Sequence, residues 1–267
     1  MNHLMRDKAP ITDAAWAEID AEATRSLTHF LAGRKLVDFS GPHGWEHSAV
    51  DLGRVQPLAE GPVAGVVAAR RRVQPLIELR TPFTVSRAEL DAADRGAADL
   101  DLDAVMAAAR AAAMAEDGSL FHGYATGGID GITELTPHPT VEITDDYSDY
   151  PSHVAKAVAI LRAADVGGPY AIALGARCYT GVTETTERGG YPVFEHLRMI
   201  LGGPVVWAPA VDGAVVLSQR GGDFELVVGE DLSVGYLAHD AETVTLFIEE
   251  SLAFRVNSPD AAVRLAY

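Results

Sequence analysis

The feature that most constrains the fold of this chain is a long extended segment over residues 50–85, VDLGRVQPLAEGPVAGVVAARRRVQPLIELRTPFTV. Glycines and prolines punctuate it, and the stretches on either side of EGPVAG are typical of the two strands of a hairpin. So long a hairpin has little capacity for a core of its own inside a compact domain. We therefore expect an arm that reaches towards another molecule, which predicts an assembly.

The amino-acid composition indicates which classes of molecule the protein could bind. The chain has 267 residues, enough for one large or two smaller domains, and 48% apolar and 22% charged residues are ordinary for a folded protein. Its net charge of −17 disfavours nucleic acid as a partner, because neutralising phosphates takes clustered Lys and Arg. Arg70, Arg71 and Arg72 form one basic run, and we interpret it as a solvated loop.

The chain carries no sequence signal for export or for a membrane. The first residues, MNHLMRDKAPITDAAW, lack the apolar run of a secretory signal, and no stretch of 18 apolar residues follows. The single cysteine, Cys178, excludes an internal disulfide and is expected to be a packed thiol. We therefore expect a protein of the cytoplasm that does not bind a membrane.

Helices are predicted in several places outside the arm. The first is expected over 12–33, with Thr12 as its N-cap, one apolar face, and Gly33 as its end. Others are expected over about 101–121 with Asp101 as the cap, and over 151–164 and 193–201.

Strands are predicted between and after these helices. YAIALG and VVWAPA are expected to be buried strands, and the end of the chain is rich in strands. In ETVTLFIEESLAFRVNS, Val244, Leu246 and Ile248 share one face. Because helices and strands alternate without a regular strand–helix–strand repeat, we predict an α+β fold.

One motif suggests a metal-dependent hydrolase. HGWEH, residues 43–47, places His43, Glu46 and His47 in the H-x-x-E-H order of a zinc peptidase. Two histidines four residues apart share a face only on a helix, whereas Gly41-Pro42 and Gly44 predict a turn here. We interpret the motif as a turn with solvent-exposed histidines and expect no metal site. No P-loop, nucleotide-binding fingerprint or GxSxG elbow is present.

Several stretches in order resemble one family, the type 1 encapsulins of the linocin/bacteriocin-like group, shell proteins with the HK97-type phage capsid fold. They are APITDAAWAEID, AGRKLVD, GPHGWEHSAVDLG, PLIELRTPFT, ELDAADRG, GPYAIAL, GGYPVFEHL and APAVDGAVVLSQRGGDFELVVGEDLSVGY. The family has Gly-Trp-Glu at HGWEH without the two histidines.

The resemblance implies a domain organisation. Residues 1–54, 81–135 and 223–267 would form the P-domain, residues 55–80 the E-loop arm, and residues 136–222 the A-domain around a fivefold axis. About sixty copies would close into a T=1 icosahedral shell. The shell would be a container rather than an enzyme, with small molecules entering through pores.

The resemblance also implies site residues. A cargo enzyme would dock by a C-terminal peptide in a groove lined by Phe30, Leu31, Arg34, Asp38, Leu232, Val234 and Tyr236. The fivefold pore loop would comprise Thr183, Glu184, Glu187, Arg188, Gly189, Gly190 and Tyr191. Some members bind a flavin near the arm, partly by stacking on a Trp. Arg87 stands at that position here, so we expect no flavin and no other cofactor, although Arg80 and Tyr191 stand at positions that fit a flavin.

The sequence leaves alternatives. A viral major capsid protein would share the fold but package nucleic acid, and a metallopeptidase or bacteriocin-like protein would use HGWEH. An engineered or orphan shell without natural cargo is a third. For a natural shell, the resemblance implies a dye-decolourising peroxidase or a ferritin-like iron protein as cargo, which connects it to oxidative stress or iron storage.

Overall fold

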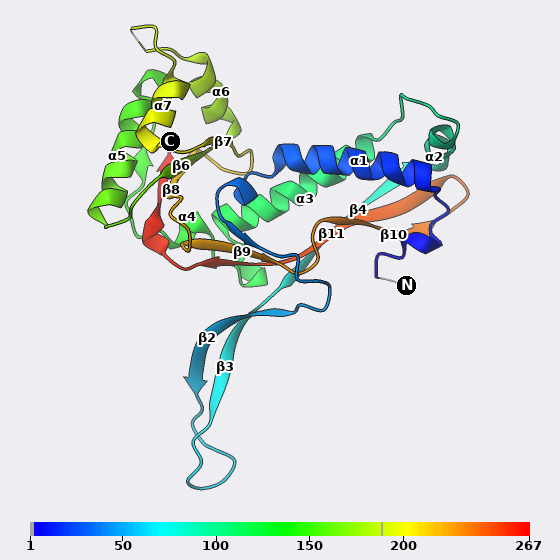
Figure 1. Ribbon diagram of the computed structural model, residues 1–267, viewed down its shortest axis with the longest axis horizontal. Coiled ribbons are helices and arrows are strands. Elements are labelled where there is room, and N and C mark those ends of the chain that lie inside the picture. Colours follow the sequence, from blue (N-terminus) through cyan, green and yellow to red (C-terminus); the bar gives the residue numbers. More distant parts are fainter. Residues whose placement is uncertain (1–2, 188) are drawn as a thin grey trace.

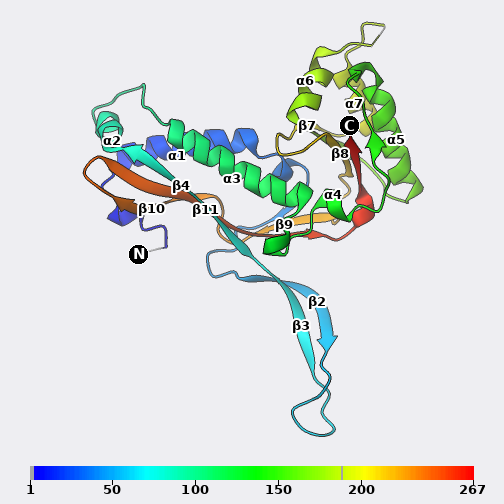
Figure 2. The same ribbon diagram turned by 180° about the vertical axis from the view of Figure 1, so that it is seen from behind.

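The computed structural model describes residues 3–187 and 189–267, which form a body of two lobes and a slender arm (Figures 1 and 2). The α-helices of this part are α1 (Asp13–Phe30), α2 (Arg87–Asp94), α3 (Asp103–His122), α4 (Ile132–Leu135), α5 (Tyr150–Ala163), α6 (Ala176–Glu184) and α7 (Val193–Leu201). Short 3-10 turns are η1 (Arg6–Lys8), η2 (Gly33–Lys35), η3 (Ala125–Gly127), η4 (Tyr147–Asp149) and η5 (Pro259–Ala261).

The first lobe is a five-stranded sheet covered on one side by two long helices. Its strands are β1 (Asp38–Ser40), β4 (Ile77–Ser86), β9 (Phe224–Val228), β10 (Ser233–His239) and β11 (Thr243–Val256). The long strand β11 organises the sheet, because β4 pairs along one edge while β9 and β10 share the other. Helices α1 and α3 lie side by side over this sheet (Figures 1 and 2).

A hydrophobic cluster fills the space between these helices and the sheet. Trp16 and Ile19 of α1 and several alanines of α3 pack against Val244, Leu246 and Ile248 of β11. The predicted shared face of these three residues is thus confirmed. The alanines let α3 approach closely, since a slim side chain leaves room for the neighbouring backbone.

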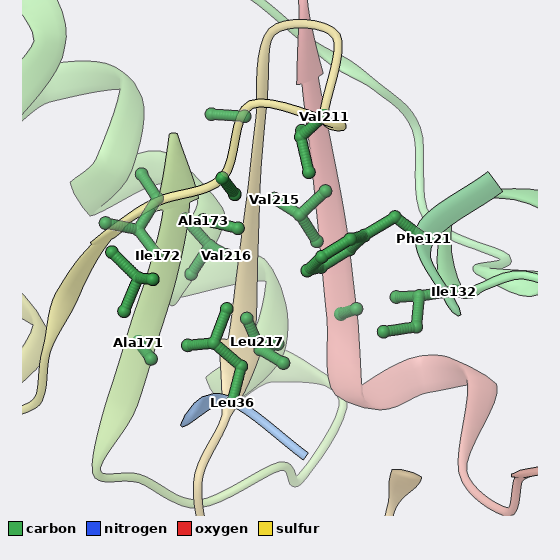
Figure 3. Packing of buried hydrophobic residues seen from close by; sticks show 14 of the residues in the cluster. Leu36, Phe121, Ile132, Ala171, Ile172, Ala173, Val211, Val215, Val216 and Leu217 are labelled. Carbon is green, nitrogen blue, oxygen red and sulfur yellow. The ribbon is translucent and has the colours of Figure 1, made fainter. Parts of the chain in front are cut away.

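The second lobe holds a separate five-stranded sheet with its own helices. Its order is β5 (Val141–Glu142), β12 (Ala262–Ala266), β8 (Ala214–Ser218), β6 (Tyr170–Leu174) and β7 (Val205–Trp207), with α5, α6 and α7 around it (Figure 1). Phe121, at the end of α3, points into this core beside Ile132 and Val215 (Figure 3). The helix α3 therefore connects the two lobes through its side chains.

The arm is the third part, defined here as residues 49–75. Strands β2 (Ala49–Pro57) and β3 (Ala69–Pro75) pair with each other, and in the described part of the chain with no other strand (Figures 1 and 2). The predicted hairpin is therefore confirmed. Arg70–Arg72 lie in β3 and not in a loop, although they are exposed as expected.

The predicted helices are confirmed, and all but the one over 193–201 have shifted ends. Thr12 is the N-cap of α1, since its side chain accepts a hydrogen bond from the N–H of Ala15. Gly33 does not end this helix, which stops three residues earlier at Phe30. An added Cβ at Gly33 would lie 2.6 Å from a Leu120 carbon, so this glycine serves the close approach of α3. Asp101 accepts the N–H of Asp103 just outside α3.

Candidate functional site

The apolar residues expected for docking lie at the end of α1 and at β10, against the cluster of the first lobe. Arg34 lies in η2 and Asp38 in β1. Leu31 and Val234 are 8% and 6% exposed and belong to the core itself. Phe30, Leu232 and Tyr236 are half-buried and present part of their surface. This surface is mainly apolar, which suits a peptide with apolar anchors.

Phe30 borders a cleft that was not predicted from the sequence. Its ring centroid lies 5.5 Å from that of Trp207 in β7, and the Arg110 guanidinium lies 5.1 Å from it. A cleft of about 520 Å³ opens beside it, lined by His29, Lys35, Tyr179, Val205, Val206 and Trp207. The half-exposed Trp207 comes from the second lobe, so only the folded chain brings it to α1.

Arg34 lies in a buried ion cluster. Its guanidinium contacts Glu116 of α3, Glu250 of β11 and Asp231 at N···O distances of 2.6, 2.7 and 2.8 Å. Burial and the charge of Glu116 raise the pKa of Glu250 well above its ordinary value. The guanidinium of Arg34 therefore neutralises carboxylates inside the subunit, and its side chain is only 19% exposed.

Two further carboxylates fix the backbone around Arg34. Asp117 of α3 accepts the N–H groups of Ala32 and Gly33, both at 2.8 Å. Burial raises the pKa of Asp117 to about 7, although these two donors oppose the rise. Asp38 of β1 accepts the N–H of Gly222. Arg34 and Asp38 therefore each have a partner within the subunit, and neither side chain is left unpaired for a peptide.

The segment before α1 covers part of the β10 edge. The N–H of Tyr236 donates to the carbonyl of Leu4 at 2.8 Å, and the Leu4 side chain is buried. Arg6 holds the segment to α1 by a bidentate pair with Asp20, while its guanidinium lies 3.9 Å from the Trp16 ring centroid. The free surface of the candidate groove is therefore nearer Phe30 than Tyr236.

The candidate pore loop connects α6 to α7 at the far end of the second lobe (Figure 1). Gly189, Gly190 and Tyr191 are exposed in this loop, whereas Thr183 and Glu184 are exposed in the last turn of α6 and not in the loop as predicted. Arg188 lies outside the described residues. The carboxylate of Glu187 lies 2.6 Å from the Nδ1 of His196. Glu184 is thus more available than Glu187 to a passing cation.

The residues expected near a flavin lie in different lobes. Arg80 of β4 pairs with Glu249 at 2.7 Å from its Nε, and its guanidinium lies 4.2 Å from the Phe247 ring centroid. Arg87 opens α2 and donates to the carbonyl of Asp240. Tyr191 belongs to the loop of the second lobe. These three side chains therefore do not come together within one subunit.

The HGWEH segment is a turn, as predicted. His43 lies 3.0 Å from the Ser40 hydroxyl, and Trp45 stacks on His3 with ring centroids 3.8 Å apart. Residues 3–187 and 189–267 contain no group of three or more His, Cys, Asp or Glu side chains arranged to hold a metal ion.

Within the same residues, no helix combines the length and apolar character needed to cross a bilayer. Cys178 is buried and accepts the hydroxyl of Tyr150 at 2.9 Å, which confirms the packed thiol.

Comparison with known proteins identifies the family. A family model described as "Encapsulating protein for peroxidase" matches residues 1–253. A type 1 encapsulin shell protein of Rhodospirillum rubrum is 54% identical over 99% of this chain and 96% of its own length. The chain belongs to the encapsulin shell protein family. An encapsulin of Rhodococcus erythropolis is 47% identical over the full length of both chains, and one of Mycobacterium tuberculosis is 43% identical, also over both full lengths.

Solved structures show the same fold in shells and capsids. The virus-like particle of Pyrococcus furiosus matches with a TM-score of 0.66 at 16% identity, over 93% of this chain and 98% of that one. The capsid of the Myoviridae phage XM1 matches with a TM-score of 0.53 at 11% identity, over 86% and 88%. The predicted α+β fold of the HK97 capsid type is therefore confirmed for this encapsulin shell protein.

Proposed function

We propose that the chain forms a T=1 icosahedral nanocompartment of about sixty copies that encloses a cargo enzyme in the bacterial cytoplasm. The observation that carries the proposal is an end-to-end family match in a chain whose arm projects from its own body. Such an arm gains buried surface only when it meets another subunit. A closed shell of identical subunits provides that contact at every position.

The two lobes and the arm support the expected division of the chain into three domains with different roles. In this proposal residues 1–54, 81–135 and 223–267 form the P-domain, 55–80 the E-loop, and 136–222 the A-domain. The arm would link subunits, while the loop between α6 and α7 would line a fivefold pore. Five copies of the exposed Glu184 would make an acidic ring that favours cations over anions.

We infer a container rather than a catalyst. A cargo enzyme would place a C-terminal peptide on the half-buried apolar surface that ends at Phe30 and Trp207. The family description names a peroxidase, which supports a dye-decolourising peroxidase as cargo ahead of a ferritin-like protein.

A viral capsid that packages nucleic acid is the second candidate, because phage capsids share the fold. A charge of −17 on every subunit would repel a genome. The absorbance ratio at 260 and 280 nm of purified particles separates the two, since a packaged genome raises it well above that of protein. Stoichiometric zinc that is lost in a His43→Ala variant would instead favour the metallopeptidase.

The mass of the particle tests the proposal directly. Sixty subunits of 28.3 kDa give a closed species of about 1.7 MDa, which mass photometry resolves from smaller assemblies. Negative-stain images of the same sample should show one size of round shell. A monomer or dimer at micromolar concentration would contradict the proposal.

Phe30→Asp is expected to give intact shells that are nearly empty. The charge would face the apolar docking surface at the end of α1, and we expect about a tenfold or greater loss of captured cargo. The measurement is the ratio of reporter to shell protein in purified particles, with a reporter that carries the C-terminal tail of a family cargo enzyme. Met199→Asp, at a side chain 65% exposed on α7, is the control. Normal loading of the Phe30 variant would place the groove elsewhere.

A further inference from the structure

One face of the arm is rich in arginine and glutamine side chains. In the β2–β3 ladder Arg54 lies directly opposite Arg72, and Gln56 opposite Arg70. Because side chains alternate along a strand, Gln74 shares this face, whereas Arg71 points to the other. We call the surface of Arg54, Gln56, Arg70, Arg72 and Gln74 the arginine face.

The arginine face is electrostatically unfavourable in an isolated subunit. Like charges directly opposite each other destabilise a pair of strands. Arg54, Arg70 and Arg72 are exposed, and none of them has an ion pair within residues 3–187 and 189–267. An anionic group from outside the subunit would relieve the repulsion between Arg54 and Arg72.

The root of the arginine face is also concave. Arg54, Arg72 and Gln74 line a cleft of about 520 Å³ where the arm meets the end of β11. Gln74 donates to the carbonyl of Phe254 at 2.8 Å, which fixes the arm against the body at this point. Arg255 on the opposite wall pairs with Glu225 at 3.3 Å. Asp130 lies in the same lining, so the two arginines of the ladder exceed it by one positive charge, which the cleft offers to an incoming carboxylate.

The distribution of charge along the chain indicates what binds the arginine face. Residues 49–75 carry a net charge of +2, from Arg54, Arg70, Arg71 and Arg72 against Asp51 and Glu60. Since the whole chain carries −17, the remaining residues carry −19. A second copy therefore presents an acidic body to a basic arm, which is the complementarity that steers association and fixes orientation.

We propose that the arginine face of the arm, with the cleft at its root, binds exposed carboxylates of a second copy of this chain. The inference rests on the proposed shell and goes further by naming the face of the arm and the chemistry of the contact. The opposite face carries the exposed Val55 and Val73 together with Arg71 and Asp51, whose opposite charges leave that face without net charge. The arginine face therefore sets how the arm seats and makes assembly sensitive to salt.

The chain offers a matched pair of variants for the test. Arg72→Glu and Arg71→Glu make the same charge change at adjacent exposed positions of β3, on opposite faces. We expect Arg72→Glu to raise the subunit concentration for half-assembly about tenfold or more, and Arg71→Glu to change it less than about twofold. Arg72→Lys keeps the charge and should assemble like the wild type. Mass photometry over a dilution series gives these values, and far-UV circular dichroism checks the subunit fold.

Salt provides an independent readout. Between about 50 and 500 mM NaCl, wild-type assembly should weaken, and this dependence should be clearly flatter in Arg72→Glu. Equal effects of the two glutamate variants, or normal assembly of Arg72→Glu, would overturn the inference while leaving the shell intact. A wild-type chain that forms no closed particle would instead remove the proposed function and the inference with it.

Nucleic acid is the other polyanion that a basic ribbon could bind. A fluorescein-labelled single-stranded DNA oligonucleotide, titrated with wild type and Arg72→Glu, tests this occupant by fluorescence anisotropy. We expect no binding at physiological salt, because the rest of the surface repels phosphates. Binding that Arg72→Glu abolishes, with assembly unchanged, would assign the arginine face to nucleic acid and overturn the contact between copies.

Discussion

Replacing Arg34 by methionine is expected to lower the free energy of unfolding by about 3–5 kcal/mol. Methionine fills much of the same volume but leaves Glu116 and Glu250, both buried, without their shared counter-charge. Thermal unfolding followed by circular dichroism, at equal subunit concentrations, should show a fall in Tm of about 10 °C. Arg177→Met is the matched control, because Arg177 pairs with Asp145 where both side chains are more than half exposed, and it should leave Tm nearly unchanged.

The loss in the Arg34 variant should depend on pH. The charge of Arg34 lowers the pKa of Glu250, which burial raises, so without the guanidinium this pKa lies still further above its unfolded value. The folded variant then binds more protons than the folded wild type. The stability of the variant relative to wild type therefore rises as the pH falls from about 8 towards about 5. An equal loss at both pH values would mean that packing, and not charge, explains the effect.

Deleting the arm tip, Glu60–Gly65, is expected to reduce closed particles about tenfold or more while the subunit stays folded. The tip lies beyond the paired ends of β2 and β3, and Val63 and Val67 are 65% and 92% exposed, so the subunit loses little internal packing. Mass photometry measures the particles, and far-UV circular dichroism measures the fold.

A side-chain variant separates loop length from apolar contact at the tip. Changing Val63, Val66 and Val67 to serine keeps the backbone but removes the exposed apolar surface. If this variant also fails to assemble, the valines bind a neighbour, whereas normal assembly would assign the effect of the deletion to loop length. Normal shells from both variants would refute the role of the arm in assembly.

Local signals predicted much of the fold. The helix α7 was expected over 193–201 and has these bounds, because Pro192 precedes it and Gly202 ends it in a left-handed conformation. The arm was expected from glycine and proline spacing alone. The helix α2 was missed, although Ser86 and Glu89 have the serine-x-x-glutamate spacing that marks a helix start, and Ser86 caps it.

The parts that could not be predicted depend on residues far apart in the chain. Gly33 has the local signature of a helix end, but a carboxylate from α3 takes the N–H groups of Ala32 and Gly33, 84 to 85 residues away. The acids at 116, 117, 249 and 250 are buried, whereas charged residues are usually solvated. Trp207 reaches the end of α1 only through the contact between lobes.

The connection between arm and body has a mechanical consequence. The strand β3 passes through Leu76 directly into β4, which pairs with β11 in one uninterrupted register from Ile77 to Ser86. A pull on the arm therefore loads that ladder along its length, so that its hydrogen bonds share the load and must slide together rather than open one by one. A subunit built in this way resists tension along the arm, so that neighbours joined by such arms would be hard to pull apart.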